Sequence, residues 1–166
     1  RMFVLILGVI VAGLLGAQRS FGSPIFAVGL LLLSAWLLKQ DIARRTIRNR
    51  GLTRFIAVCL LSGYMWLAVG ASIILAAGGL SPGTPSYDAA VHALALGFVF
   101  SMVFGHAPII FPAVLRVAVP YHRSFYVPLA LLHVSLAVRL AGDATGQYSW
   151  TRVGALLNAL ALAAFI

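Results

Sequence analysis

The sequence predicts an all-α integral membrane protein, a polytopic bundle of about six transmembrane helices. Of its 166 residues, 62% are hydrophobic and only 9% are charged, and the mean hydropathy is +1.04. These values lie far outside the range of soluble domains. Apolar runs that approach the roughly 20 residues needed to cross the hydrocarbon core also recur along the whole chain. We therefore expect a single transmembrane domain over residues 1–166.

Six apolar segments are expected to form these helices. They cover roughly 2–17, 24–38, 54–78, 88–115, 124–142 and 150–166. Glycine, proline and serine mark several of the junctions, as in 20–24 and 78–86. The chain opens on Arg1 and stops inside an apolar run. We expect it to be part of a longer protein.

The charges predict an orientation. There are 12 Lys and Arg residues against three acidic residues. If segment 39–54 is cytoplasmic and the helices alternate, nine basic residues lie inside and three (Arg19, Arg139 and Arg152) lie outside. This indicates a bacterial inner-membrane protein whose loop 39–54 is cytoplasmic, and it gives no reason to expect nucleic-acid binding. Alternatively, the same loop forms a basic amphipathic helix on the lipid surface.

Histidines within the apolar segments are the candidate functional residues. His92 and His106 lie in the fourth segment and His133 lies in the fifth. Fourteen residues at about 100° each amount to about 1400°, so His92 and His106 should share one helix face with Val99 and Val103. Ionisable groups inside a membrane span indicate ligands, proton carriers or counter-ions. Neutral imidazoles from facing helices are suited to haem iron or copper, and interhelical hydrogen bonding is the alternative.

The opposite face of the fourth segment is expected to pack tightly. Ala93, Gly97, Ser101 and Gly105 follow one another at four-residue spacing. Small residues in this pattern let a second helix approach closely. The segment should therefore have one face for packing and one face that offers imidazoles to a cleft.

The depth of the histidines limits what they can bind together. His133 is expected on an antiparallel helix at a depth similar to that of His106. His92 lies roughly 21 Å from His106 along the helix axis, too far for one metal, so using all three requires two sites. Arg139, at the outer end of the fifth segment, is expected either to pair with a haem propionate or to form a local ion pair with Asp143.

At these residues the sequence resembles the NnrS family of membrane proteins, which are associated with haem, copper and the response to nitric oxide. The resemblance comprises His92-Ala-Leu-Ala-Leu-Gly97, Gly105-His106 and the Val138-Arg139 ending, over about a third of the chain. It implies that metal or haem binding carries over to His92 and His106. The interval between these histidines is shorter than in that family, and Ala-Pro follows His106.

We therefore expect a membrane protein that binds haem b, copper or both through His92, His106 and His133, with Arg139 beside the cofactor. Its role would be redox chemistry, a nitric-oxide-related reaction or electron transfer. The expected partners are the lipid bilayer, other membrane subunits and a small gas. The competing hypotheses are a cofactor-free accessory subunit of a larger complex and a small transporter. No motif decides whether the chain is an enzyme.

Overall fold

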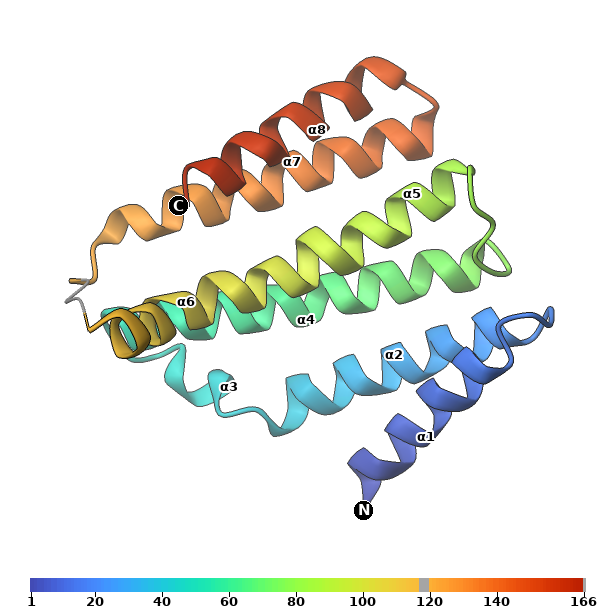
Figure 1. Cartoon of the computed structure of the whole chain (residues 1–166), viewed down its shortest axis with the longest axis horizontal. Helices are drawn as coiled ribbons and strands as arrows, with labels where there is room; N and C mark the ends of the chain where they lie inside the picture. The colour runs from blue at the N-terminus through green and yellow to red at the C-terminus, as the bar shows by residue number, and fades with distance from the viewer. Residues whose placement is uncertain (117–119, 166) are drawn as a thin grey trace.

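The computed structural model describes residues 1–116 and 120–165, and all regular structure in these residues is helical. The elements are α1 (Met2–Leu15), α2 (Gly22–Gln40), α3 (Ala43–Thr46), α4 (Leu52–Ala76), α5 (Pro85–His92), the π-helix η1 (Ala93–Val99), α6 (Phe100–Leu115), the 3-10 turn η2 (Arg123–Phe125), α7 (Tyr126–Thr145) and α8 (Tyr148–Ala163) (Figure 1). The predicted all-α class is confirmed for this part of the chain.

Among the described residues, four helical stretches are long and apolar enough to cross a membrane. They are Gly22–Gln40, Leu52–Ala76, Pro85–Leu115 and Arg123–Thr145. The first and last predicted spans correspond to α1, with 14 residues, and α8, with 16 residues. At 1.5 Å per residue these helices measure about 21 and about 24 Å, less than the roughly 30 Å of the hydrocarbon core. Length and composition therefore identify four of the six predicted segments as candidate spans.

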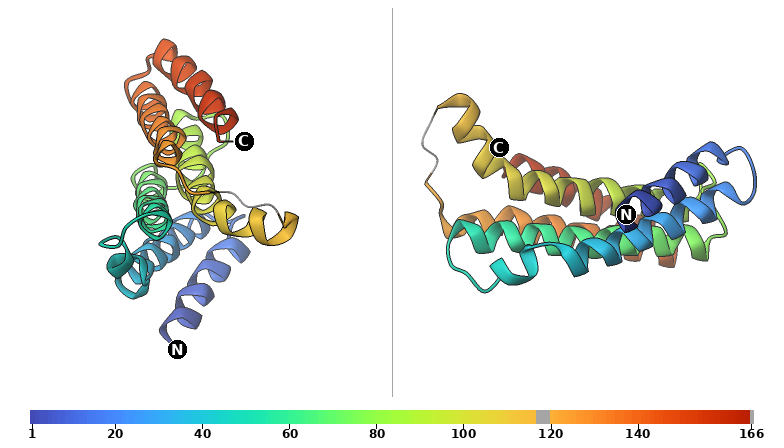
Figure 2. Two further views of the ribbon diagram at one scale, coloured as in Figure 1. Left: turned by 90° about the vertical axis from the view of Figure 1, so that its left-hand side faces the viewer. Right: turned by 90° about the horizontal axis from the view of Figure 1, so that it is seen from below.

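The long helices lie side by side, and consecutive ones run in opposite directions (Figure 1). α4 is central, because it contacts α2 on one side and the continuous α5–η1–α6 helix on the other. The pairs α1–α2 and α7–α8 form the two edges of the arrangement. The last turns of α6 rise away from the other helices (Figure 2), and large apolar side chains such as Phe111 and Val114 are exposed there.

The largest core cluster joins α4, α6, α7 and α8. Its buried members are Phe55, Cys59, Phe104, Leu129, Leu132 and Ala161. The rings of Phe104 and Phe165 stack with centroids 3.8 Å apart, which fastens the end of α8 to α6. Cys59 is fully buried and serves as a small core residue.

The predicted small-residue face of the fourth segment packs on α4, as expected. Ala93, Gly97, Ser101 and Gly105 are all buried. A Cβ atom added to Gly97 would lie 2.5 Å from Cβ of Trp66, and one added to Gly105 would lie 3.1 Å from Cβ of Cys59. The two backbones therefore approach at distances that only small residues allow.

We expect Gly97→Ala to destabilise the protein by about 1–2 kcal/mol, because the new methyl group overlaps Trp66 and a packed interface must move to accept it. The matched control is Gly8→Ala in α1, where an added Cβ meets nothing within 4 Å. That change should be neutral or stabilising, since alanine is the better helix former. Unfolding in mixed detergent micelles measures both. Equal effects of the two substitutions would contradict the interpretation.

Candidate functional site

His133 joins α7 to α4 through both ring nitrogens. Trp66 Nε1 donates to His133 Nδ1 over 3.0 Å, and His133 Nε2 lies 3.0 Å from Ser62 Oγ. The Ser62 hydroxyl donates in turn to the carbonyl oxygen of Cys59 at 3.0 Å. Because the indole N–H is only a donor, Nδ1 must be the acceptor, and a neutral ring then carries its proton on Nε2 and donates to Ser62.

This arrangement gives His133 a structural task. Both nitrogens are hydrogen-bonded, and the imidazole ring also stacks on Trp66 with centroids 6.3 Å apart. Binding a metal through Nδ1 would require Trp66 to move away. The geometry therefore fits the interhelical hydrogen-bonding alternative for this residue.

A second polar cluster lies at the opposite end of the helices from loop 39–54. Arg139 of α7 binds the Asp88 carboxylate through Nε at 3.1 Å and Nη2 at 2.9 Å. His92 Nδ1 lies 2.8 Å from the Asp88 carbonyl oxygen and 3.3 Å from its carboxylate. The Arg139 side chain is 14% exposed and that of Asp88 is 37% exposed. This cluster connects α5 to α7 at that end of the helices.

Arg139 pairs with Asp88, a partner that was not predicted from the sequence. Asp143, the expected local partner, instead accepts a hydrogen bond from Thr151 of α8 at 3.0 Å. Asp88 occupies the first turn of α5, where Thr84 caps the helix by accepting from Tyr87 N and Pro85 starts it. A carboxylate is favourable at that helix end. One feature of the sequence could have indicated this pair. Asp88 begins the fourth predicted segment and Arg139 lies near the end of the antiparallel fifth segment, so the two residues are expected at the same end of the bundle.

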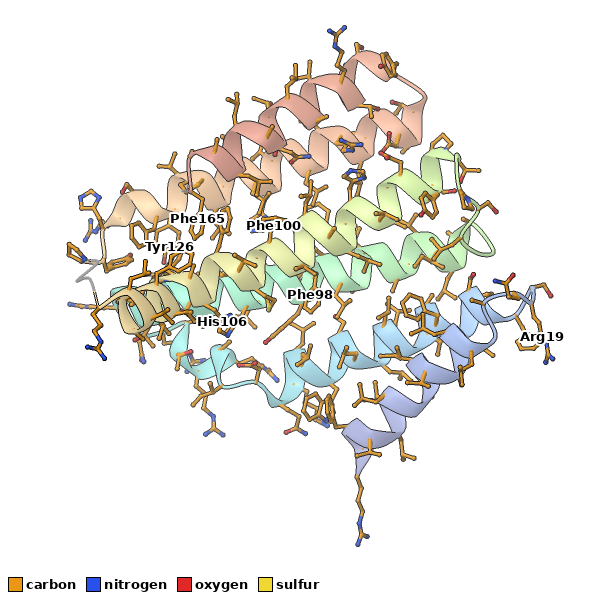
Figure 3. The ribbon with its side chains drawn as sticks, in the orientation of Figure 1. Arg19, Phe98, Phe100, His106, Tyr126 and Phe165 are labelled. Carbon is orange, nitrogen blue, oxygen red and sulfur yellow. The ribbon has the colours of Figure 1, made fainter. Side chains whose placement is uncertain are left out.

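His106 lies on an open side of α6. Its Nδ1 is 2.7 Å from the Met102 carbonyl oxygen, and this is its only hydrogen bond among the described residues. The neighbouring Val99, Val103 and Ile110 are 49%, 42% and 50% exposed, so this face points outward. In Figure 3, Phe98 points toward α2 and Phe100 toward α7, whereas His106 lies on the side of α6 away from α7.

The prediction that His92 and His106 share a face depended on 100° of rotation per residue throughout. Seven of the intervening residues form the π-helix Ala93–Val99, which turns less per residue than an α-helix. The premise therefore fails for this segment. His92 joins the cluster with Asp88 and Arg139, while His106 stands alone on the exposed face.

The three histidines do not form one centre. Within residues 1–116 and 120–165, no three His, Cys, Asp or Glu side chains are placed to hold a metal ion together. Each histidine instead has its own environment: an ion-pair cluster for His92, an exposed apolar strip for His106 and a hydrogen-bonded cross-link for His133.

Over residues 1–116 and 120–165, these features define an all-helical protein with four helices of membrane-spanning length and with polar cross-links inside an apolar bundle. The chain belongs to the family described as Domain of unknown function (DUF8744), which matches residues 1–166. No curated protein and no solved structure matches it.

Proposed function

We propose that this chain is an integral protein of the bacterial inner membrane, with its six apolar segments in the bilayer and loop 39–54 in the cytoplasm. The distribution of charge supports this. Cations at the start of α1, from the end of α2 to the start of α4, and between α6 and α7 all belong to one end of the helix array. That end carries nine of the 12 basic residues, as the positive-inside rule requires of the cytoplasmic side.

In this membrane protein, the chain binds haem b through His106. The main support for this proposal is the orientation of the His106 imidazole. A carbonyl oxygen only accepts, so Met102 requires the proton on Nδ1, and the neutral ring is left with its lone pair on Nε2. Ligating histidines are commonly oriented in this way, with the second nitrogen bound to a backbone carbonyl.

The surroundings of His106 also suit haem. A haem ligand needs an unprotonated nitrogen and an apolar surface for the porphyrin, and Val99, Val103 and Ile110 provide such a surface. His92 has the same bond from Nδ1 to the carbonyl four residues earlier, so it is the candidate at the outer level. Arg139 would have to leave Asp88 to meet a propionate. Copper usually takes two or three such ligands at one point, which favours haem over copper.

A bound haem would supply a redox-active iron that can bind small gases. His106 would be the residue that holds it. Because Trp66 and Ser62 already occupy both ring nitrogens of His133, we favour binding of a gas such as nitric oxide over electron transfer. The protein would hold the His106 imidazole in position by its Nδ1–H bond to the Met102 carbonyl, which leaves Nε2 free to bind the iron.

The test is the reduced-minus-oxidised optical spectrum of the protein purified in detergent, together with iron and copper analysis. We expect a haem b difference band that is lost in His106→Gly and restored by added imidazole. The matched control is His122→Gly, because His122 is exposed in the loop before α7, where it bonds with Ser124. Nitric oxide should shift the band of the reduced protein.

A haem-free, metal-free protein that is folded would overturn this proposal and favour a cofactor-free accessory subunit. One observation favours that second function: the last turns of α6 present apolar side chains such as Ile109 and Leu115 with no covering helix among the described residues.

The small-transporter hypothesis is weaker. A transporter of this kind is expected to contain two broken helices, one in each half of the chain. Only the η1–α6 region is a candidate for such a helix, because the long helices α2 and α4 show no π segment.

A further inference from the structure

A basic depression lies where α2 meets α3. Its volume is about 590 Å³, and its lining residues are Lys39, Gln40, Asp41, Ile42, Arg44, Arg45 and Arg48. Asp41 is already engaged, because Oδ2 accepts from the Tyr64 hydroxyl at 2.6 Å and Oδ1 accepts from the Ala43 amide at 2.7 Å. In the part of the chain that the structure describes, none of the four cations forms an ion pair. With four cations and the one carboxylate of Asp41, the depression has a formal excess of three positive charges.

An apolar groove opens from the same place. Lys39 and Arg44 also line a groove of about 740 Å³ between α2, α3 and α4. Its other walls are Ala35, Leu38, Ile47, Val58, Leu61, Ser62 and Met65. All of these except Ser62 are apolar. The two features meet at Lys39 and Arg44, so a hydrocarbon-lined groove ends in a cluster of cations.

We propose that this groove and depression together bind one anionic phospholipid, with an acyl chain along Leu61 and Met65 and the phosphate at Lys39 and Arg44. The shape and the charge are complementary to such a molecule. Basic pockets between helices on the cytoplasmic side of a membrane attract anionic headgroups, and Arg forms strong charge-assisted hydrogen bonds with phosphate. The site rests on the proposed orientation, with loop 39–54 in the cytoplasm, and it is independent of whether His106 binds haem.

Another copy of this chain is a poor alternative occupant. The chain has only three acidic residues. Asp41 already lies in this depression, Asp88 is paired with Arg139, and Asp143 lies at the opposite end of the helices beside Thr151. A second copy therefore offers too little negative charge to neutralise four cations. Inorganic phosphate would satisfy the charge but would leave the apolar groove unfilled.

The experiment measures binding of phosphatidylglycerol and phosphatidylcholine to the delipidated full chain by native mass spectrometry. In Lys39→Gln/Arg44→Gln we expect phosphatidylglycerol affinity to fall about thirtyfold, because each juxtamembrane cation contributes roughly a fivefold factor. The matched control is Arg50→Gln/Arg54→Gln, which removes the same charge at the same end but from a separate depression. It should change affinity by less than about threefold, because these two cations lie outside the proposed contact and act on the headgroup only through screened long-range attraction.

A second variant tests the groove without altering charge. Met65→Trp fills the groove and should lower phosphatidylglycerol affinity, and millimolar inorganic phosphate should not compete. Equal losses in the two charge variants would overturn the proposal in favour of diffuse attraction. Full competition by phosphate would identify a free-anion site, and equal binding of phosphatidylcholine would remove the role of charge. Circular dichroism confirms that each variant is folded.

Discussion

The Asp88→Asn variant is expected to lose about 2–3 kcal/mol of stability. The substitution leaves the Arg139 guanidinium, 14% exposed, without its anionic partner inside an apolar bundle. Removing one member of a buried ion pair costs about 3–5 kcal/mol, and we place the effect lower because Asp88 is 37% exposed. Chemical unfolding in mixed micelles, followed by helical circular dichroism, measures the change.

A second substitution separates the charge from other effects of the asparagine. Asp88→Asn/Arg139→Gln removes both charges and allows the two amides to hydrogen-bond, so it should be more stable than Asp88→Asn alone. A double variant that is as unstable as the sum of the two single variants would show that the ion pair is not the source of the effect. A loss below about 0.5 kcal/mol for Asp88→Asn would indicate that Arg139 reaches water or headgroups instead.

His133→Leu should destabilise the protein by about 2 kcal/mol. Leucine removes the acceptor of the Trp66 indole N–H, and an unsatisfied buried donor costs about 1–3 kcal/mol. The loss of the His133–Ser62 hydrogen bond costs less, because the Ser62 hydroxyl still donates to the carbonyl oxygen of Cys59. The same unfolding measurement applies, and His122→Leu in the exposed loop is the matched control.

A double-mutant cycle with Trp66→Phe assigns this loss to the hydrogen bond. Interhelical hydrogen bonds in membrane proteins contribute about 0.6 kcal/mol on average and up to about 1.7. We expect the coupling between His133 and Trp66 to lie near the upper end, because the indole also stacks on the ring. Additive effects of the two substitutions would mean that His133 does not hold α7 to α4 through Trp66.

The sequence predicted the helices well because hydrophobic runs and their Gly, Pro and Ser boundaries are local signals. Predicted segment 54–78 is α4 at Leu52–Ala76, and predicted segment 88–115 ends at Leu115 as expected. The short α3 lies within loop 39–54, where a basic surface helix was only the alternative expectation. The π-helix η1 was not predicted, because hydrogen bonds from residue i to i+5 have no signature in composition or periodicity.

The candidate site was predicted less well, because it depends on which faces of the helices pack against one another. The small-residue ridge gave one such face correctly. The partners of His133 lie 67 and 71 residues away in the chain, on α4, so no local pattern connects them with it. Helix spacing could estimate the depth of each histidine. It could not show that the rings would point toward different neighbours.

The π-helix η1 has a consequence for the geometry of the α4 contact. In a regular α-helix, residues four apart rotate by about 400°, so a ridge with that spacing drifts by about 40° at each step. The slower rotation of η1 opposes this drift, which keeps Ala93, Gly97, Ser101 and Gly105 aligned along one line. Two helices can then mesh over a long distance without coiling around one another. The sequence repeat that maintains this contact is a four-residue one, and inserting or deleting a single residue within η1 would put one half of the contact out of phase with the other.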